Sequence, residues 1–113
     1  MSEEDFKVLL QDIKDYLHIS WNDEKTDKNL TGIIKRGMAR LKDVAGVSIL
    51  DFKEEDLPRT LLFDYCRYAN SHALEMFENN FQGELLSLHL MCQAQVIIDQ
   101  QTEEGVADEN QST

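Results

Sequence analysis

The chain has 113 residues, of which 42% are apolar and 29% are charged, which is typical of a folded soluble protein of one domain. Eleven basic and 22 acidic side chains give a net charge of −11, which argues against binding of nucleic acid through its phosphates. No apolar run approaches the roughly 18 residues that cross a bilayer, and the acidic start MSEEDFK is not typical of a signal peptide.

The cysteines and the charges add two further expectations. Cys66 and Cys92, without a secretory signal, predict free thiols in a reducing cytoplasm. All Lys and Arg residues lie at or before Arg67, and the remaining chain carries only carboxylates. This anionic part either serves solubility, or lies near DNA that must not bind, or meets a basic partner.

The first predicted helix spans about residues 3–18. Ser2 is a suitable cap, carboxylates follow it, and apolar residues recur at three- and four-residue spacing: Phe6, Leu9, Leu10, Ile13 and Leu17. A polar connection, ISWNDEKTDKN, follows. We expect its one large apolar residue, Trp21, to cover the end of the core.

A second helix is predicted from a cap at Thr26 or Asp27 to Gly46, a typical left-handed C-terminal residue. Gly37 interrupts its apolar face at a cost of about 1 kcal/mol relative to Ala, and close approach of another backbone is the expected compensation. The opposite face carries the basic residues Lys35, Arg36, Arg40 and Lys42. They form a solvated face or contact an acidic partner, such as the C-terminal half of another copy.

A loop over residues 46–57 has possible anchors at Ile49, Leu50 and Phe52. Asp56 and Pro58 then open a third helix, since proline is tolerated in a first turn. Its apolar stripe is predicted to continue without a break, and consists of Leu61, Leu62, Tyr65, Ala69, His72, Ala73 and Met76.

The apolar segment after Phe81 is ambiguous, because Leu86, Leu88 and Leu90 alternate as in a strand. Residues 96–99, VIID, can pair as a strand with a partner. We nevertheless predict an all-α fold, a small bundle of about four helices over residues 1–92, because the family resemblance described below favours a helix for this segment. Residues 93–113 form a flexible acidic C-terminal arm that is disordered in the free protein.

No constellation typical of catalysis is present. Cys66 and His72 are six residues apart, which is about 240° around a helix. The three histidines lack zinc-ligand spacing, and no phosphate loop, nucleophile elbow or Cys-x-x-Cys motif occurs. We therefore expect no catalytic, metal or cofactor site. A thiol enzyme would need His18 or His89 beside Cys66, and His72 is expected to be a core histidine.

Three segments together resemble one family. IKDYLHI, TDKNLTGIIKRGMARLKDVAG and LPRTLLFDYCRYANSHALEMFENNFQGELLSL, in that order, resemble the head–tail connector (head completion or adaptor) proteins of long-tailed bacteriophages and prophages. The resemblance covers about residues 5–90 and rests on order and length more than on single signature residues.

The resemblance implies an all-α virion assembly protein without cofactors, which forms a ring at the head–tail junction. Copies would assemble in the host cytoplasm from monomers, as a dodecamer in the virion, between the portal protein and a stopper or tail-completion protein. DNA would pass through the channel without specific binding. Interface candidates by position are Arg67, Tyr68, Phe81, Val96, Ile97 and Ile98, and from the basic face Lys35, Arg36 and Arg40.

A second hypothesis belongs to a different class. A small cytoplasmic helical adaptor would bind one partner helix or basic peptide in an apolar groove. Neither hypothesis requires a membrane.

Overall fold

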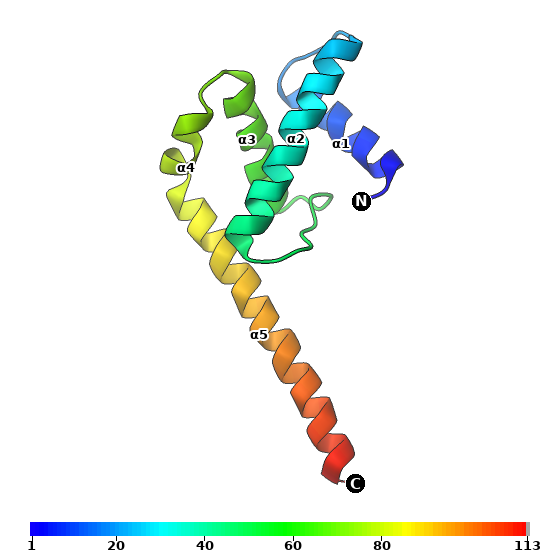
Figure 1. The fold of residues 1–113 in the computed structure, drawn as a ribbon, viewed down its shortest axis with the longest axis vertical. Helices are drawn as coiled ribbons and strands as arrows, with labels where there is room; N and C mark the ends of the chain where they lie inside the picture. The colour runs from blue at the N-terminus through cyan, green and yellow to red at the C-terminus, as the bar shows by residue number, and fades with distance from the viewer. Residues whose placement is uncertain (113) are drawn as a thin grey trace.

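The computed structural model describes the backbone of residues 1–112 and the side chains of residues 1–102. Five α-helices make up the fold, and no strand occurs in residues 1–112 (Figure 1). They are α1 (Glu3–Tyr16), α2 (Glu24–Ala45), α3 (Leu57–Asn70), α4 (Phe77–Asn80), which a 3₁₀ turn at Leu74–Met76 precedes, and α5 (Gln82–Ser112). The predicted all-α class is confirmed.

The start of α2 differs from its prediction. Asp23 is the cap, and its carboxylate accepts from the amide and the hydroxyl of Thr26 at 3.2 and 2.9 Å. Asp27 is not the cap because its Oδ1 lies 2.8 Å from Nζ of Lys14, a side chain of α1 that is only 3% exposed. A buried ammonium needs such a partner, so a contact distant in sequence determines the role of Asp27.

The core lies where α2 packs against α3 and α5. Gly37 stands at the tightest point, because a Cβ there would lie 2.7 Å from Cδ1 of Tyr65 and 2.9 Å from Cδ1 of Leu62. The predicted close approach exists, but α3 makes it with side chains and not with its backbone. Gly46 ends α2 at a φ of 72°, as predicted.

The connection after α2 is held by Phe52. This side chain is buried, whereas Ile49 is exposed. Arg59 of α3 donates to the Phe52 carbonyl at 3.2 Å and to Asp12 of α1 at 2.7 Å. Of the three predicted anchors of the loop, Phe52 is confirmed and Leu50 is half-buried against the core. The prediction for Ile49 is wrong, because its side chain is exposed.

The end of α3 corrects the predicted apolar stripe. Asp56 is the cap and Pro58 lies in the first turn, as expected, but the helix ends at Asn70. His72 has a φ of 56° and is exposed, so the core-histidine prediction is wrong. The chain reverses through the 3₁₀ turn, and Phe77, at the start of α4, fills the core where Met76 had been expected.

Trp21 also differs from its prediction, since it is 55% exposed. Ile19, two residues earlier, is buried and covers this end of the core instead. His18 turns the chain at a φ of 61° and so directs Ile19 inward. A single large apolar residue in a polar connection was therefore a poor guide to which side chain is buried.

The last helix, α5, leads away from the other helices, and the molecule measures 63 × 33 × 19 Å (Figure 1). The disorder of residues 93–113 in the free protein, and the strand that residues 96–99 would form with a partner, stay predictions; residues 93–102 continue this helix. Side-chain hydrogen bonds along the helix accompany it, Gln95 to Asp99 at 2.9 Å and Thr102 to the Ile98 carbonyl at 3.0 Å. The side chains of residues 103–113 lie outside the described residues, so their flexibility stays a prediction.

Candidate functional site

Two hydrogen bonds attach α5 to the C-terminal end of α2. Nδ1 of His89 donates to the Val44 carbonyl at 2.8 Å, and Nε2 of Gln93 donates to the Ala45 carbonyl at 2.8 Å. The last carbonyls of a helix lack partners within the helix, so these two side chains satisfy groups that α2 leaves open. Gly46 leaves room for the contact, because a Cβ there would lie 2.6 Å from Nε2 of Gln93.

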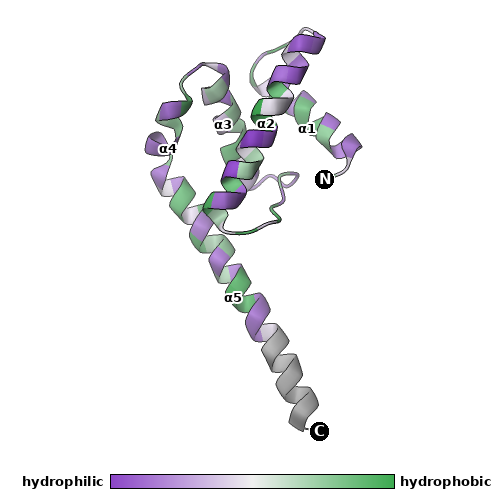
Figure 2. Cartoon of the chain, in the orientation of Figure 1, coloured by the Kyte–Doolittle hydropathy of each residue, from purple (hydrophilic) through white to green (hydrophobic). Residues whose placement is uncertain are grey.

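Exposed apolar side chains also lie along α5. We name this surface the outer face of α5; its residues are between 49% and 58% exposed and comprise Leu86, Leu90, Met91, Ile97 and Ile98. No Asp, Glu, Lys or Arg occurs between Glu84 and Asp99. Apolar residues also recur on the core side, at Leu85 and Leu88 (Figure 2). The polar residues of this stretch, Ser87, His89, Gln93 and Gln95, are uncharged, and exposed apolar surface of this kind is typical of contact sites.

The predicted interface residues of the arm lie on this helix. Ile97 and Ile98 belong to the outer face, whereas Val96 is half-buried. Their backbone groups are used within α5, so in this conformation only their side chains are available for a contact.

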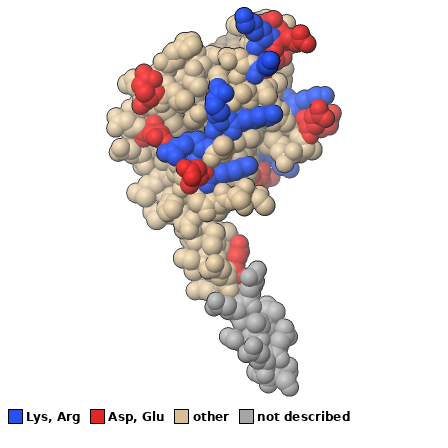
Figure 3. Space-filling view, viewed as in Figure 1, with Lys and Arg blue, Asp and Glu red and all other residues tan. Residues whose placement is uncertain are grey.

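The basic candidates lie along α2, where Figure 3 shows Lys and Arg side chains gathered. Arg40 is bound to Glu78 and, at 2.8 Å, to Asp43. The hydrogen bond to Glu78 raises the pKa of Arg40 above its ordinary value. Nζ of Lys35 lies 5.7 Å from the centre of the Phe6 ring. Of the candidates Lys35, Arg36 and Arg40, Arg40 is the one that pairs with a carboxylate of residues 1–102.

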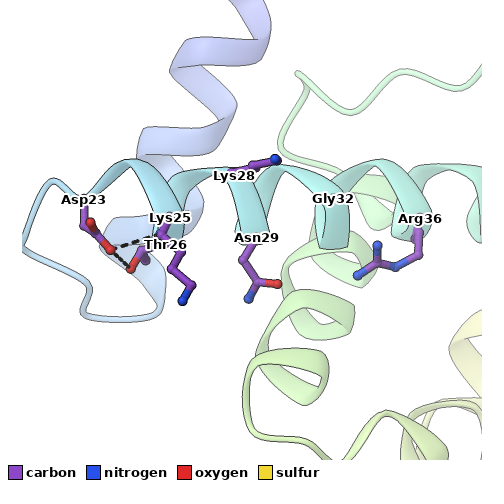
Figure 4. A pocket seen from close by; sticks show the side chains of 7 residues that line it. All are labelled: Asp23, Lys25, Thr26, Lys28, Asn29, Gly32 and Arg36. Atoms are coloured by element: carbon purple, nitrogen blue, oxygen red, sulfur yellow. Dashed lines mark hydrogen bonds between the residues drawn. The ribbon is translucent and has the colours of Figure 1, made fainter.

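An open hollow runs along the first half of α2 (Figure 4). Arg36 folds back toward Gly32, where a Cβ would lie 3.2 Å from its Nη1. Asp23 is occupied as the helix cap, so the groups available in this hollow are ammonium, guanidinium and amide. They suit an anionic partner and supply no nucleophile or general base. The residues lining the hollow are Asp23, Lys25, Thr26, Lys28, Asn29, Gly32 and Arg36.

Arg67, Tyr68 and Phe81 belong to an aromatic cluster within the chain. The guanidinium of Arg67 lies 4.8 Å from the centre of the Tyr68 ring. Tyr68 meets Phe77 and Phe81 edge to face, at centroid distances of 5.9 and 5.6 Å. These contacts join α3 to α4 and to the start of α5, so packing accounts for the two aromatic candidates. Arg67 stays partly exposed and pairs with Asp64 at 3.3 Å.

Cys66 lies in the core, where burial raises the pKa of its thiol to about 12. A thiol with so high a pKa is a poor nucleophile, because the thiolate is the reactive form. His89 is bound to Val44, and His72 is exposed beyond the end of α3. Among the residues that the structure describes, no group of three His, Cys, Asp or Glu side chains is placed to hold a metal ion.

The sequence interpretation missed Leu86, Leu90 and Met91 as surface residues. Leu86, Leu88 and Leu90 alternate as in a strand, and a strand would place all three on one face. In the helix Leu88 is buried while Leu86 and Leu90 are exposed. The missing signal was available: residues 85–98 lack charge on every side of a helix.

Comparison of the chain with family models, with curated proteins and with solved structures gives no match in any of the three. None of the helices within the described residues is long and apolar enough to span a membrane.

Proposed function

We propose that this chain is a structural assembly protein, the subunit of a homo-oligomeric ring that joins a phage portal to the tail or stopper protein and extends the DNA channel. One observation carries the assembly part of the proposal: the outer face of α5 is apolar, exposed and without charge between Glu84 and Asp99. Contiguous exposed apolar surface of this kind is typical of protein–protein contact sites.

The partners follow from the arrangement of the helices. The core formed by α1 to α4 and the first turns of α5 buries most of its large apolar side chains, and the exposed ones, such as Val8, Trp21 and Ile49, are scattered along the chain. The remainder of α5 adds apolar surface that this core does not cover, so its partner is another molecule. We assign the outer face to contacts with neighbouring copies and with the portal protein.

The place of action, the head–tail junction of a virion, rests on the resemblance of residues 5–90 to connector proteins. The net charge of −11 supports it, because a ring of such subunits surrounds its channel with negative potential. DNA then slides through without being held, since few cations replace its counterions. The proposal includes a monomer in the host cytoplasm and a dodecamer in the virion.

The test is ring formation on the portal protein encoded next to this chain's gene. Electron microscopy of the mixture should show an added ring of wild-type subunits. The double variant Leu90→Asp/Ile97→Asp places two carboxylates on the outer face and should reduce binding at least tenfold, because each charge would be buried unpaired. The matched control is Val8→Asp/Ile49→Asp, which adds the same charge at two exposed apolar residues elsewhere.

Wild-type protein that stays monomeric at high concentration and does not bind the portal would overturn the proposal. Equal loss of binding in both double variants would show a charge effect and not an interface. A one-to-one complex with a single helical partner, without rings, would favour the cytoplasmic adaptor.

A further inference from the structure

The ion pairs of this protein are distributed unevenly between α2 and the rest of the chain. Every Lys and Arg outside α2 lies within ion-pair distance of a carboxylate. These pairs include the nearly buried Arg59, 2.7 Å from Asp12, and the exposed Lys53, 3.5 Å from Asp5. In a chain with twice as many acidic as basic residues, such pairing is the expected state of a cation.

The cations of α2 differ. Arg40 pairs with Asp43 and Glu78, but its five companions have no carboxylate of residues 1–102 within ion-pair distance. We name these five the cationic face of α2: Lys25, Lys28, Lys35, Arg36 and Lys42.

Lys and Arg side chains gather on the face of the molecule shown in Figure 3, whereas the buried residues of α2 are apolar ones such as Leu30, Ile34 and Leu41. Lys28, Lys35 and Lys42 follow at seven-residue intervals, so they form one row with a drift of about 20° per step and a spacing of about 10 Å. Lys25 and Arg36 form a second row beside the hollow of Figure 4. Like charges in rows repel one another, and an anionic partner removes that cost.

The same chain contains a segment of complementary charge. Residues 99–109 have five carboxylates and no Lys or Arg, namely Asp99, Glu103, Glu104, Asp108 and Glu109. The segment follows directly on the uncharged stretch of residues 85–98. A subunit that docks through the outer face of α5 therefore brings this acidic segment close to its neighbour.

Up to residue 102, α5 runs away from the cationic face of its own chain. His89 and Gln93 hold α5 at the C-terminal end of α2. From there α5 leads away from α2, whereas the cationic face extends back toward the start of α2 (Figure 1). A contact between two copies leaves this course of α5 unchanged, which favours the acidic segment of a neighbouring copy as the occupant.

We propose that the cationic face of α2 binds the acidic segment of residues 99–109 of a second copy. Each subunit then has one cationic face, on α2, and one acidic segment, in the C-terminal part of the chain. Contacts of two different surfaces repeat in one direction, and they form a ring where the rotation between subunits closes and an open filament where it does not. This inference rests on the self-association in the proposed function and adds its polarity; it does not depend on the portal or on a virus.

A charge exchange in the full-length chain tests the contact. Lys28→Glu/Lys35→Glu makes the cationic face anionic, and Glu103→Lys/Glu104→Lys makes the acidic segment cationic. Each variant alone should lose wild-type association at low salt by at least tenfold, measured by sedimentation velocity across a concentration series. An equimolar mixture of the two should restore it, because each altered surface then meets its complement.

The controls change the net charge equally at other places. Lys7→Glu/Lys53→Glu matches the first variant, and both lysines are exposed and form only surface pairs. Glu54→Lys/Glu75→Lys matches the second at exposed carboxylates. Both controls should associate as the wild type does, and the wild-type association should weaken when salt is raised from 50 to about 500 mM.

The outcomes are distinct. Wild-type protein whose sedimentation does not depend on concentration at low salt overturns the contact, as does a mixture that fails to restore association. Duplex DNA that binds wild type but not Lys28→Glu/Lys35→Glu would assign the cationic face to DNA and also overturns it. Rings that form on the portal regardless of the charge variants would keep the connector function and reject this contact. Restored association without portal binding would do the reverse.

Discussion

The two longest helices, α2 and α5, differ in the chemistry of the side that faces away from the core. The core side of α2 is apolar and its outer side is polar and basic, so α2 is fully solvated on the side that its own chain does not cover. The core side of α5 is apolar too, but its outer face is apolar as well. An amphipathic helix such as α2 is satisfied within one molecule, whereas α5 leaves apolar side chains in contact with water. The comparison separates residues that stabilise the fold from exposed apolar residues that we propose contact a partner.

The largest expected difference lies between two leucines of α5. Leu88 is 0% exposed and Leu90 is 57% exposed. Leu88→Ala should lower the free energy of unfolding by about 2–5 kcal/mol, because it leaves a cavity in the core. Leu90→Ala should change it by less than about 0.5 kcal/mol. Urea unfolding of the free protein measures both. Equal losses would show that both sides of α5 are packed within one molecule.

Two glycines of α2 allow a similar comparison, between a position packed against the core and one beside a flexible side chain. Gly37→Ala should destabilise the protein by about 1–3 kcal/mol, because the new Cβ meets Tyr65 and Leu62 at 2.7 and 2.9 Å. Gly32→Ala meets only the flexible end of Arg36 at 3.2 Å, and it should stabilise the helix by up to about 1 kcal/mol. Thermal unfolding followed by circular dichroism separates the two. A stabilising Gly37→Ala would mean that α2 and α3 do not approach as closely as described.

The smallest effect concerns the cysteines. Burial raises the pKa of the Cys66 thiol from 9.0 to about 12, so at pH 10 the unfolded chain has lost this proton and the folded chain has kept it. The unfolded state then binds fewer protons, and stability falls as the pH rises above 9. Cys66 should account for about 1 kcal/mol of the loss by pH 10.

The measurement is urea unfolding at pH 8 and pH 10 for the wild type and for Cys66→Ala. The variant starts from a lower stability but should lose less on going to pH 10. Cys92→Ala, a change at a half-buried position of α5, should lose nearly as much as the wild type. An identical loss in wild type and Cys66→Ala would contradict the burial of Cys66.

Local signals in the sequence predicted the beginnings and ends of helices wherever one residue decides them. Ser2, Asp56 with Pro58, and Gly46 each act through their own backbone geometry or hydrogen bonds. The cap of α2 was assigned to the wrong residue, although Asp23 binds Thr26 three residues later in the usual local pattern. The pairing of Asp27 with Lys14, which is distant in sequence, has no local signal.

The end of α3 was missed for a similar reason. The apolar period continues through His72, and no glycine marks the left-handed residue that turns the chain. The turn is stabilised by the burial of Phe77 between Tyr65 and Tyr68. The centroid of the Phe77 ring lies 5.5 Å from that of Tyr65 and 5.9 Å from that of Tyr68. The basic residues of the candidate surfaces were predicted from spacing alone, but their pairing required the positions of carboxylates on other helices.

The joint between α2 and α5 has a consequence for geometry. Two hydrogen bonds from His89 and Gln93 determine the angle at which α5 leaves the other helices, and Gly46 has no room for a side chain that would change it. In a closed ring every subunit repeats the same angle, so a small error adds up around the circle instead of averaging out. Residue 46 would then be constrained by the circumference of the assembly as well as by the end of one helix.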